Sequence, residues 1–335
     1  MPSWRCMSDI PRGDIPTVMT KTNWGAIAPL TDAQIEAARP PKNDVDSWKP
    51  YAFLSEPERS SDGAIVDVAT IFLTNRECPF RCVFCDLWKN TTDQRVPLGA
   101  IPKQIAFALD QLPRCHSVKL YNSGNFFDRQ AIPLEDHRAI GQLVGDFDTV
   151  IVENHPSLCN DECLRFRDRL NGRLEMALGL ETAHPQVLAR LNKRMSPETF
   201  QRAVEFLVQE QIPVRSFILL RPPYLGESVA REWAVRSLRF AFDCGIECCT
   251  IIPTRKGNGA LEQLAQIGQF STPQLASLEA VFTAGLEMER GRVFVDLWDL
   301  DRLSTCRLCA AERKQRLLRM NLSQRVLPAV RCGVC

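Results

Sequence analysis

The stretch AIVDVATIFLTNRECPFRCVFCDLWKN, residues 64–90, decides the fold, because it joins an apolar strand to a loop that carries three cysteines. Its first ten residues are nearly all apolar, which is typical of a parallel strand that is covered on both faces. The loop then places Cys78, Cys82 and Cys85 in C-x3-C-x2-C order. In βα folds the working residues cluster where strands end, so we expect a site at this strand end.

Strands of the same kind recur along the chain and alternate with segments that have helical spacing. The further strand candidates lie at 117–122, 149–154, 174–181, 213–220 and 248–253. The helix candidates between them lie at 101–112, 134–144, 157–170, 197–210 and 227–242. Such alternation predicts an α/β fold with a parallel sheet, and six right-handed units can curl into part of a barrel. We therefore predict a partial (β/α)6 TIM-like barrel.

Three parts are expected along the chain. Residues 1–60 form an N-terminal arm, rich in Pro, Asp, Ser and Lys, with one short helix at 31–40. Residues 61–270 form the core domain. Residues 271–335 form a C-terminal extension with a helix, a strand-like VFVDLW segment and four cysteines.

The composition excludes several classes of protein. Apolar residues make up 45% and charged residues 24% of the 335 residues, which is typical of a globular protein and not of a disordered or fibrous one. The net charge of +1 argues against a generally basic, nucleic-acid-coating surface. The sequence has no apolar run that could cross a bilayer, and its start, MPSWRCMSDIPRGD, does not resemble a signal peptide. We expect a cytoplasmic location and no membrane contact.

The cysteines indicate metal binding. Fourteen cysteines are too few for a disulfide scaffold in a chain of this length, and in the cytoplasm they stay reduced. Half of them fall into tight groups: Cys78, Cys82 and Cys85, then Cys306 with Cys309, then Cys332 with Cys335. Three thiolates on one loop suit a four-iron cluster in which one iron lacks a protein ligand. A zinc site with a fourth ligand from elsewhere and a metal-free loop of buried thiols remain alternatives.

With Phe84 as the aromatic residue of the loop, the chain resembles the radical S-adenosylmethionine (SAM) superfamily over about residues 65–255. The resemblance implies a 4Fe-4S cluster on Cys78, Cys82 and Cys85, with SAM chelating the open iron. One electron, from a donor such as flavodoxin or ferredoxin, then splits SAM into methionine and a 5′-deoxyadenosyl radical that abstracts hydrogen from a substrate. The substrate and the catalytic residues that act on it stay unassigned.

The resemblance also implies SAM contacts at the ends of the first two strands. Phe84 would lie beside the adenine. Ser123, Gly124 and Asn125 follow the second strand, where the family meets the SAM ammonium. An ordinary strand-to-helix turn is the alternative for this segment.

Later strand ends complete the expected SAM site. Glu153 opens a Glu-x-x-Pro motif that resembles the branch with oxygen-independent coproporphyrinogen oxidase, the Elongator catalytic subunit and the methylthiotransferases. The resemblance implies that Glu153, like Glu181, lies around the SAM ribose. Glu181 stands where these relatives contact the ribose, and Ser216 on the fifth strand lies near another ribose contact. Lys193 or Arg194 would pair with the SAM carboxylate, unless both are solvated cations on a helix surface.

The run Asn-Ser-Gly-Asn-Phe-Phe-Asp, residues 122–128, resembles the radical subunit of archaeosine synthase, which acts on a modified base in tRNA. An enzyme that modifies tRNA bases is therefore one alternative function. Cationic residues between the tail cysteines could face RNA or form the outer face of an ordinary helix. These residues are Arg313, Lys314, Arg316, Arg319 and Arg325.

The tail pairs Cys306–Cys309 and Cys332–Cys335 have the C-x2-C spacing of metal sites. Zinc and a second iron–sulfur cluster suit them equally, and reduced thiols on a loose tail are the third possibility. A non-catalytic zinc or iron–sulfur protein that binds a partner through this tail is the remaining alternative function.

Overall fold

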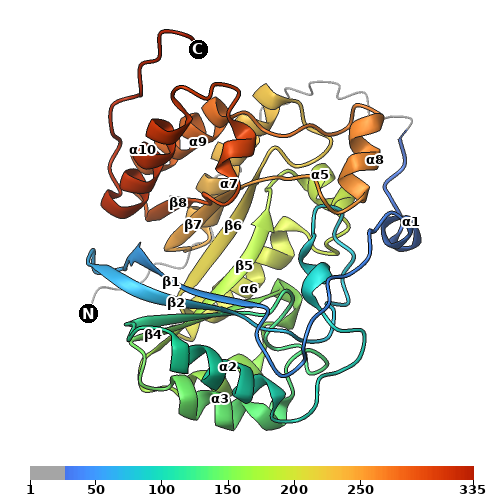
Figure 1. Cartoon of the computed structure of the whole chain (residues 1–335), viewed down its shortest axis with the longest axis vertical. Helices are drawn as coiled ribbons and strands as arrows, with labels where there is room; N and C mark the ends of the chain where they lie inside the picture. The colour runs from blue at the N-terminus through green and yellow to red at the C-terminus, as the bar shows by residue number, and fades with distance from the viewer. Residues whose placement is uncertain (1–26) are drawn as a thin grey trace, which may run out of the picture.

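The computed structural model describes residues 27–335, so the first 26 residues of the expected arm lie outside the described part. One sheet of eight strands, in the order β1-β2-β3-β4-β5-β6-β7-β8, forms the core. The strands are β1 (Ala52–Arg59), β2 (Ile65–Phe72), β3 (Ser117–Tyr121), β4 (Thr149–Asn154), β5 (Arg173–Glu181), β6 (Val214–Leu220), β7 (Cys248–Pro253) and β8 (Arg292–Val295). Strands β2 to β8 run parallel, and β1 pairs antiparallel with β2. The sheet curls into a half-barrel (Figure 1).

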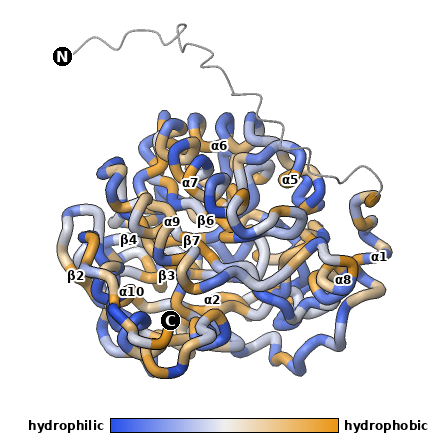
Figure 2. Tube along the Cα trace, turned by 90° about the horizontal axis from the view of Figure 1, so that it is seen from above, coloured by the Kyte–Doolittle hydropathy of each residue, from blue (hydrophilic) through white to orange (hydrophobic). Residues whose placement is uncertain are grey.

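Helices connect the strands. Those of the α type are α1 (Asp32–Ala37), α2 (Ala100–Gln111), α3 (His137–Val144), α4 (Asp161–Arg167), α5 (Pro185–Arg190), α6 (Pro197–Gln209), α7 (Glu227–Asp243), α8 (Ala260–Gln266), α9 (Leu275–Glu287) and α10 (Ala310–Ser323). Single 3-10 turns are η1 (Leu87–Asn90), η2 (Leu134–Asp136), η3 (Pro156–Leu158) and η4 (Leu300–Leu303). In Figure 2 hydrophilic and hydrophobic residues alternate along the helices, as expected when one face of each is buried. Within residues 27–335 every helix is too short or too polar to cross a membrane.

Helix α6 shows how the local sequence sets these elements. The Ser196 hydroxyl accepts from the Thr199 N–H at 3.2 Å, and Pro197 occupies the first turn, where its missing N–H costs nothing. Phe200 and Val204 then recur at helical spacing and are fully buried. The helix therefore covers the sheet with one apolar stripe.

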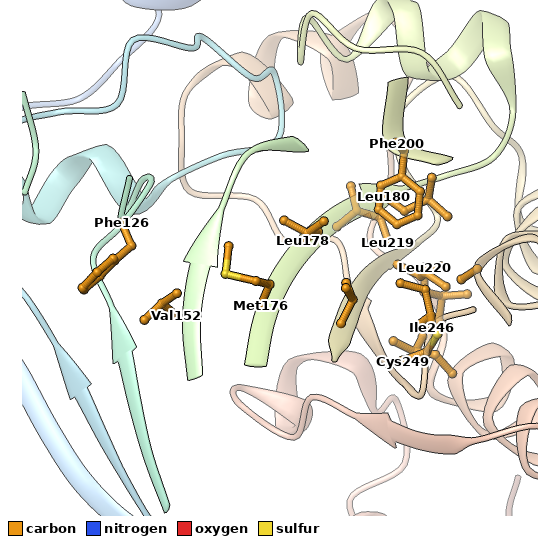
Figure 3. Close-up of a cluster of buried hydrophobic side chains, with 14 of the residues drawn as sticks. Phe126, Val152, Met176, Leu178, Leu180, Phe200, Leu219, Leu220, Ile246 and Cys249 are labelled. Atoms are coloured by element: carbon orange, nitrogen blue, oxygen red, sulfur yellow. The ribbon is translucent and has the colours of Figure 1, made fainter. Parts of the chain in front are cut away.

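The hydrophobic core lies between the sheet and the surrounding helices. Because side chains alternate along a strand, Val152 of β4 and Met176 and Leu178 of β5 point to this outer face. Figure 3 shows them together with Phe200 of α6. The residues between them point to the inside of the half-barrel, which is the face that remains for chemistry.

A buried charge network fills the base of the half-barrel, near the amino ends of the parallel strands. Arg215 contacts Glu175 at 2.5 Å and Glu58 at 3.0 Å, and Lys119 also pairs with Glu58. Although burial opposes it, Arg215 and Lys119 hold the pKa of Glu58 well below its usual value. Each charge has an opposite partner, so the base is closed and the carboxyl strand ends are left for a site.

Helix α10 covers the free edge of β8 with side-chain amides. Asn321 donates to the Val295 carbonyl and accepts from its N–H, both at 2.9 Å. Gln324 does the same with Val293 at 2.8 Å. The helix also packs against β1, and Arg59 donates to the Leu322 carbonyl at 3.4 Å. The backbone groups of β8 are therefore paired, although β8 is the edge strand of the sheet in residues 27–335.

The partial α/β barrel predicted from the sequence is confirmed, and all six expected strands lie within a residue or two of the observed β2 to β7. Strands β1 and β8 extend the sheet beyond residues 61–270 at both ends. We did not expect β1, because Pro57 and its charged neighbours hide a strand pattern; the strand tolerates proline because it lies at the sheet edge. Helices α5 and α8 were also missed, since each is only about two turns long.

Candidate functional site

The three cysteines of the first loop follow β2 directly. Cys78, Cys82 and Cys85 are free and partly buried. Burial raises the pKa of Cys85 to about 12 and that of Cys82 well above its usual value. Ionisation of these thiols therefore requires a positive centre nearby, which a bound metal supplies.

The cysteine loop, residues 78–85, is fixed from several sides. Asn258, which follows β7, donates to the carbonyls of Val83 at 2.7 Å and Cys85 at 3.2 Å. The Trp88 indole N–H also donates to the Cys85 carbonyl, at 3.1 Å. The backbone N–H of Val83 donates to the Leu191 carbonyl at 3.0 Å. The loop is thus held in position by its surroundings.

The turn after β3 lies against this loop. The Asn125 amide donates to the Cys78 sulfur at 3.2 Å, and Ser123 places its hydroxyl 3.0 Å from that of Tyr51. A Cβ on Gly124 would lie 3.5 Å from the Cys78 Cβ, an ordinary contact. The segment expected at the SAM ammonium therefore adjoins the cysteines.

The carboxylate of Glu153, at the end of β4, fixes the turn after β3 through backbone hydrogen bonds. Its Oε1 accepts from the backbone N–H groups of Asn122 at 2.5 Å and Gly124 at 3.3 Å. Burial raises the pKa of Glu153 to about 7, although these backbone donors act in the opposite direction. In this structure Glu153 shapes the turn, whereas the resemblance implied a contact to the ribose.

Glu181 and Lys193 form a buried ion pair at the end of β5. The strand has an irregular register at this point, and Glu181 adopts a left-handed backbone with φ +66°. Gly179 is needed here, because a Cβ would lie 2.1 Å from the Glu181 Oε1 and 2.3 Å from the Lys193 Nζ. Arg194 points elsewhere and pairs with Asp32 of α1, with 54% of its side chain exposed. Of the two cations considered from sequence, only Lys193 faces the inside.

Ser216 does not join this group. In the sheet it lies between Leu178 and Cys249, whose side chains belong to the helix-facing core shown in Figure 3. The side-chain alternation of β6 therefore turns Ser216 away from the inner face, which corrects the expectation of a ribose contact. Phe84 is partly buried and packs against the core at the cysteine loop.

Asn122 lies in the turn after β3 and has a buried side-chain amide that lacks hydrogen-bond partners, as do several other buried polar groups in residues 27–335. Asn122 is 0% exposed, yet neither the oxygen nor the nitrogen of its side-chain amide has a hydrogen-bond partner. Buried amides are nearly always paired, so such a group needs an explanation. Asn122 lies beside Ser123 and the cysteine loop, and a polar ligand bound there would satisfy it. The donor set of three thiols, a free amide and a buried Lys–Glu pair thus fits an iron–sulfur cluster with a polar, zwitterionic ligand.

An aromatic row on the inner face was also missed. Tyr121 lies 6.2 Å from both Phe72 and Phe217, and Phe72 lies 6.4 Å from Trp298, measured between ring centroids. Trp298 is 59% exposed. These residues come from β2, β3, β6 and the segment after β8. The alternation of side chains along each strand could have predicted from the sequence that the three strand residues point inward.

The two described surface cavities, of about 340 and 380 Å³, lie elsewhere. Their walls include Gly145 and Asn171 in one case and Arg173 and Gln211 in the other. These residues precede β4, β5 and β6 or, for Arg173, begin β5, so both cavities are at the opposite end of the strands from the cysteine loop.

The pKa of Glu153 predicts a pH dependence of stability for the metal-free protein. The carboxyl titrates at about 7 when folded and at 4.5 when unfolded. Between these values the unfolded chain releases a proton that the folded chain keeps, so the free energy of unfolding falls as pH rises. At about 1.4 kcal/mol per pKa unit, the full loss is about 3 kcal/mol above pH 7. In Glu153→Gln this loss should be absent when the free energy of unfolding is measured with urea at several pH values. If the free energy of the variant fell with pH as steeply as that of the unaltered protein, other groups would cause the effect.

No protein-family model matches this chain. An uncharacterized protein of Methanocaldococcus jannaschii is 23% identical over 310 residues, which cover 83% of this chain and 82% of that protein. Archaeosine synthase subunit beta of Methanosarcina acetivorans is 30% identical over 173 residues, 48% of each chain. Among solved structures, Streptococcus suis SuiB bound to its precursor peptide SuiA matches with a TM-score of 0.50 and 13% identity, over 72% of this chain and 49% of that one.

The sequence comparison confirms the resemblance to archaeosine synthase, because relatives named archaeosine synthase subunit beta match this chain. At 13% identity the likeness to SuiB shows the fold alone. The matched region spans about half the length of the archaeosine synthase subunit and of SuiB.

Proposed function

We propose that this protein is a radical SAM enzyme whose 4Fe-4S cluster is held by Cys78, Cys82 and Cys85. One observation carries the proposal: the loop with these thiols contacts a turn that holds a fully buried, unpaired amide, that of Asn122. When bound, cluster and SAM together supply methionine and a 5′-deoxyadenosyl radical that abstracts hydrogen from the substrate. The protein itself fixes the thiols and keeps the base of the half-barrel closed.

The SAM contacts follow from what each strand end offers. Lys193 is the buried cation for the SAM carboxylate, and Glu181 beside it can accept hydrogen bonds from ribose hydroxyls. Ser123, Gly124 and Asn125, with Asn122 next to them, provide oxygen acceptors for the ammonium. Phe84 is the aromatic residue of the cysteine loop and is proposed to lie beside the adenine.

We propose a nucleobase in RNA as the substrate. Two observations favour it: the sequence match to archaeosine synthase subunit beta, and the aromatic row, whose rings suit stacking on a base. The basic tail gives less support than the sequence suggested. Arg313 pairs with Glu279, and Arg316 is buried against the carbonyls of Leu327 and Pro328.

The remaining assignments complete this proposal. Residues 61–270 serve as the catalytic core, with 1–60 as an arm and 271–335 as an extension. The electron comes from a flavodoxin or ferredoxin in the cytoplasm.

The experiment that tests the proposal is anaerobic reconstitution with iron and sulfide, followed by dithionite and SAM. We expect the cluster's absorbance and the release of 5′-deoxyadenosine. If the protein bound iron but released no 5′-deoxyadenosine under these conditions, it would instead be the non-catalytic iron–sulfur or zinc protein considered above. Addition of tRNA should increase turnover, and binding should weaken with salt. Turnover that stays unaffected by RNA would reject the RNA substrate while leaving the enzyme class intact.

A further inference from the structure

The four tail cysteines converge at the start of α10. The sulfur atoms of Cys306, Cys309, Cys332 and Cys335 all lie within 4.8 Å of one another, and no other group of potential ligands in residues 27–335 is as close. Cys306 and Cys309 precede α10 or begin it, whereas the other two lie in the segment that follows the helix. Figure 1 shows that segment as it returns past α10 and α9.

The sulfur–sulfur distances fit one metal ion. Cys306 and Cys332 are 3.8 Å apart, and Cys309 and Cys335 are 3.4 Å apart. Four thiolates at about 2.3 Å from a tetrahedral zinc ion lie about 3.8 Å from one another. A four-iron cluster gives each thiolate its own iron, so its ligand sulfurs lie farther apart. A disulfide would need about 2.0 Å, and all four thiols are free.

Each C-x2-C pair also forms the same backbone loop. The Cys306 sulfur accepts from the backbone N–H groups of Leu308 and Cys309. The Cys332 sulfur accepts in the same way from Val334 and Cys335. Two equivalent loops therefore present their first cysteine with N–H donors that stabilise a thiolate, as outer-shell groups do around metal ions.

Two arginine side chains next to the four tail cysteines stabilise their arrangement. Arg313, one turn after Cys309, contacts the Cys309 sulfur and forms two hydrogen bonds with Glu279 at 3.1 and 2.6 Å. Arg316 donates to the carbonyls of Leu327 and Pro328 at 2.8 to 3.1 Å. Arg316 thus holds the segment that follows α10 against the helix. Arg313 offsets part of the negative charge of the four thiolates.

We propose that Cys306, Cys309, Cys332 and Cys335 bind a single zinc ion in a closed structural site. All four positions of the tetrahedron are taken by protein sulfur, so the ion has no place for a substrate or for SAM. It fastens residues 324–335 to the start of α10, the helix whose amides cover the edge of β8. The site is independent of the cluster on the first loop.

Metal analysis of two variants tests this assignment. In the Cys78→Ala/Cys82→Ala/Cys85→Ala variant we expect no iron after reconstitution and about one zinc per chain. In Cys306→Ser/Cys309→Ser we expect the zinc to be lost while the iron of the first loop remains. Cys244→Ser, at a partly buried thiol outside both groups, is the control and should keep both metals. Iron that remains in the first variant and disappears only with the tail cysteines would show a second cluster and overturn the proposal.

A second measurement keeps the proposal testable if the tail variant does not fold. Titration of the native protein with an organomercurial should release zinc as the thiols react, and hydrogen exchange should then rise first in residues 324–335. Cobalt that replaces zinc should show the absorption of a tetrahedral tetrathiolate. Zinc-free native protein in which these four thiols are oxidised to disulfides would contradict the assignment.

Discussion

Alanine at Cys82 should lower the formation of 5′-deoxyadenosine at least about a thousandfold, which corresponds to about 4 kcal/mol of barrier. Only three protein ligands are available to the proposed cluster, so removal of one leaves an iron–sulfur centre that the loop cannot retain. The same result is expected at Cys78 and Cys85. The measurement is chromatographic quantification of the nucleoside after reconstitution, together with iron content.

Cys115→Ala is the matched control for this prediction. Its thiol is also free and partly buried, but it lies before β3 and contacts Ser55, away from the cysteine loop. Activity of this variant should equal that of the unaltered protein. Normal nucleoside formation by Cys82→Ala would remove the basis of the proposed function.

Gly179→Ala should weaken SAM binding by at least about a hundredfold, or about 3 kcal/mol. The new methyl group would lie 2.1 Å from the Glu181 Oε1 and 2.3 Å from the Lys193 Nζ, so the charged ends of this buried ion pair would both have to move. The displaced charges would then no longer lie where SAM is proposed to meet them. Equilibrium dialysis with labelled SAM measures the affinity, and urea unfolding measures the accompanying loss of stability.

Gly226→Ala provides the comparison. A Cβ at Gly226 meets nothing within 4 Å, and its φ of −70° suits any residue, so alanine should leave SAM binding unchanged. Because Gly226 is the N-cap of α7, where glycine is favoured over alanine, stability should fall by about 1 kcal/mol at most. If Gly179→Ala bound SAM as tightly as Gly226→Ala, Lys193 and Glu181 would not be the SAM contacts.

The parallel strands of the sheet are buried on both faces, so their sequences are short apolar runs such as 149–154. Such runs are typical of buried strands, and this is why the sequence predicts the sheet well. The edge strands carry this signal less clearly. Strand β1 is half polar and was not expected, whereas β8, which has only four residues, lies in the VFVDLW segment that the sequence marked as strand-like.

The site was predicted less completely than the fold. Motif spacing selects the three cysteines as candidates, but it cannot decide between Lys193 and Arg194, because the choice depends on Asp32 of α1, which binds Arg194. For Ser216 the strand parity was available in the sequence and was overlooked. The unpaired amide of Asn122 and the separations between the tail sulfurs depend on packing across distant segments, and only the structure reveals them.

The amides of Asn321 and Gln324 have a consequence for solubility. If α10 came away from β8, the hydrogen-bonding groups of Val293 and Val295 would be open to pairing with another molecule, because unprotected strand edges recruit further strands. Loosening of α10 would then appear first as aggregation and only later as lost catalysis. The helix can therefore be regarded as a cap against self-assembly.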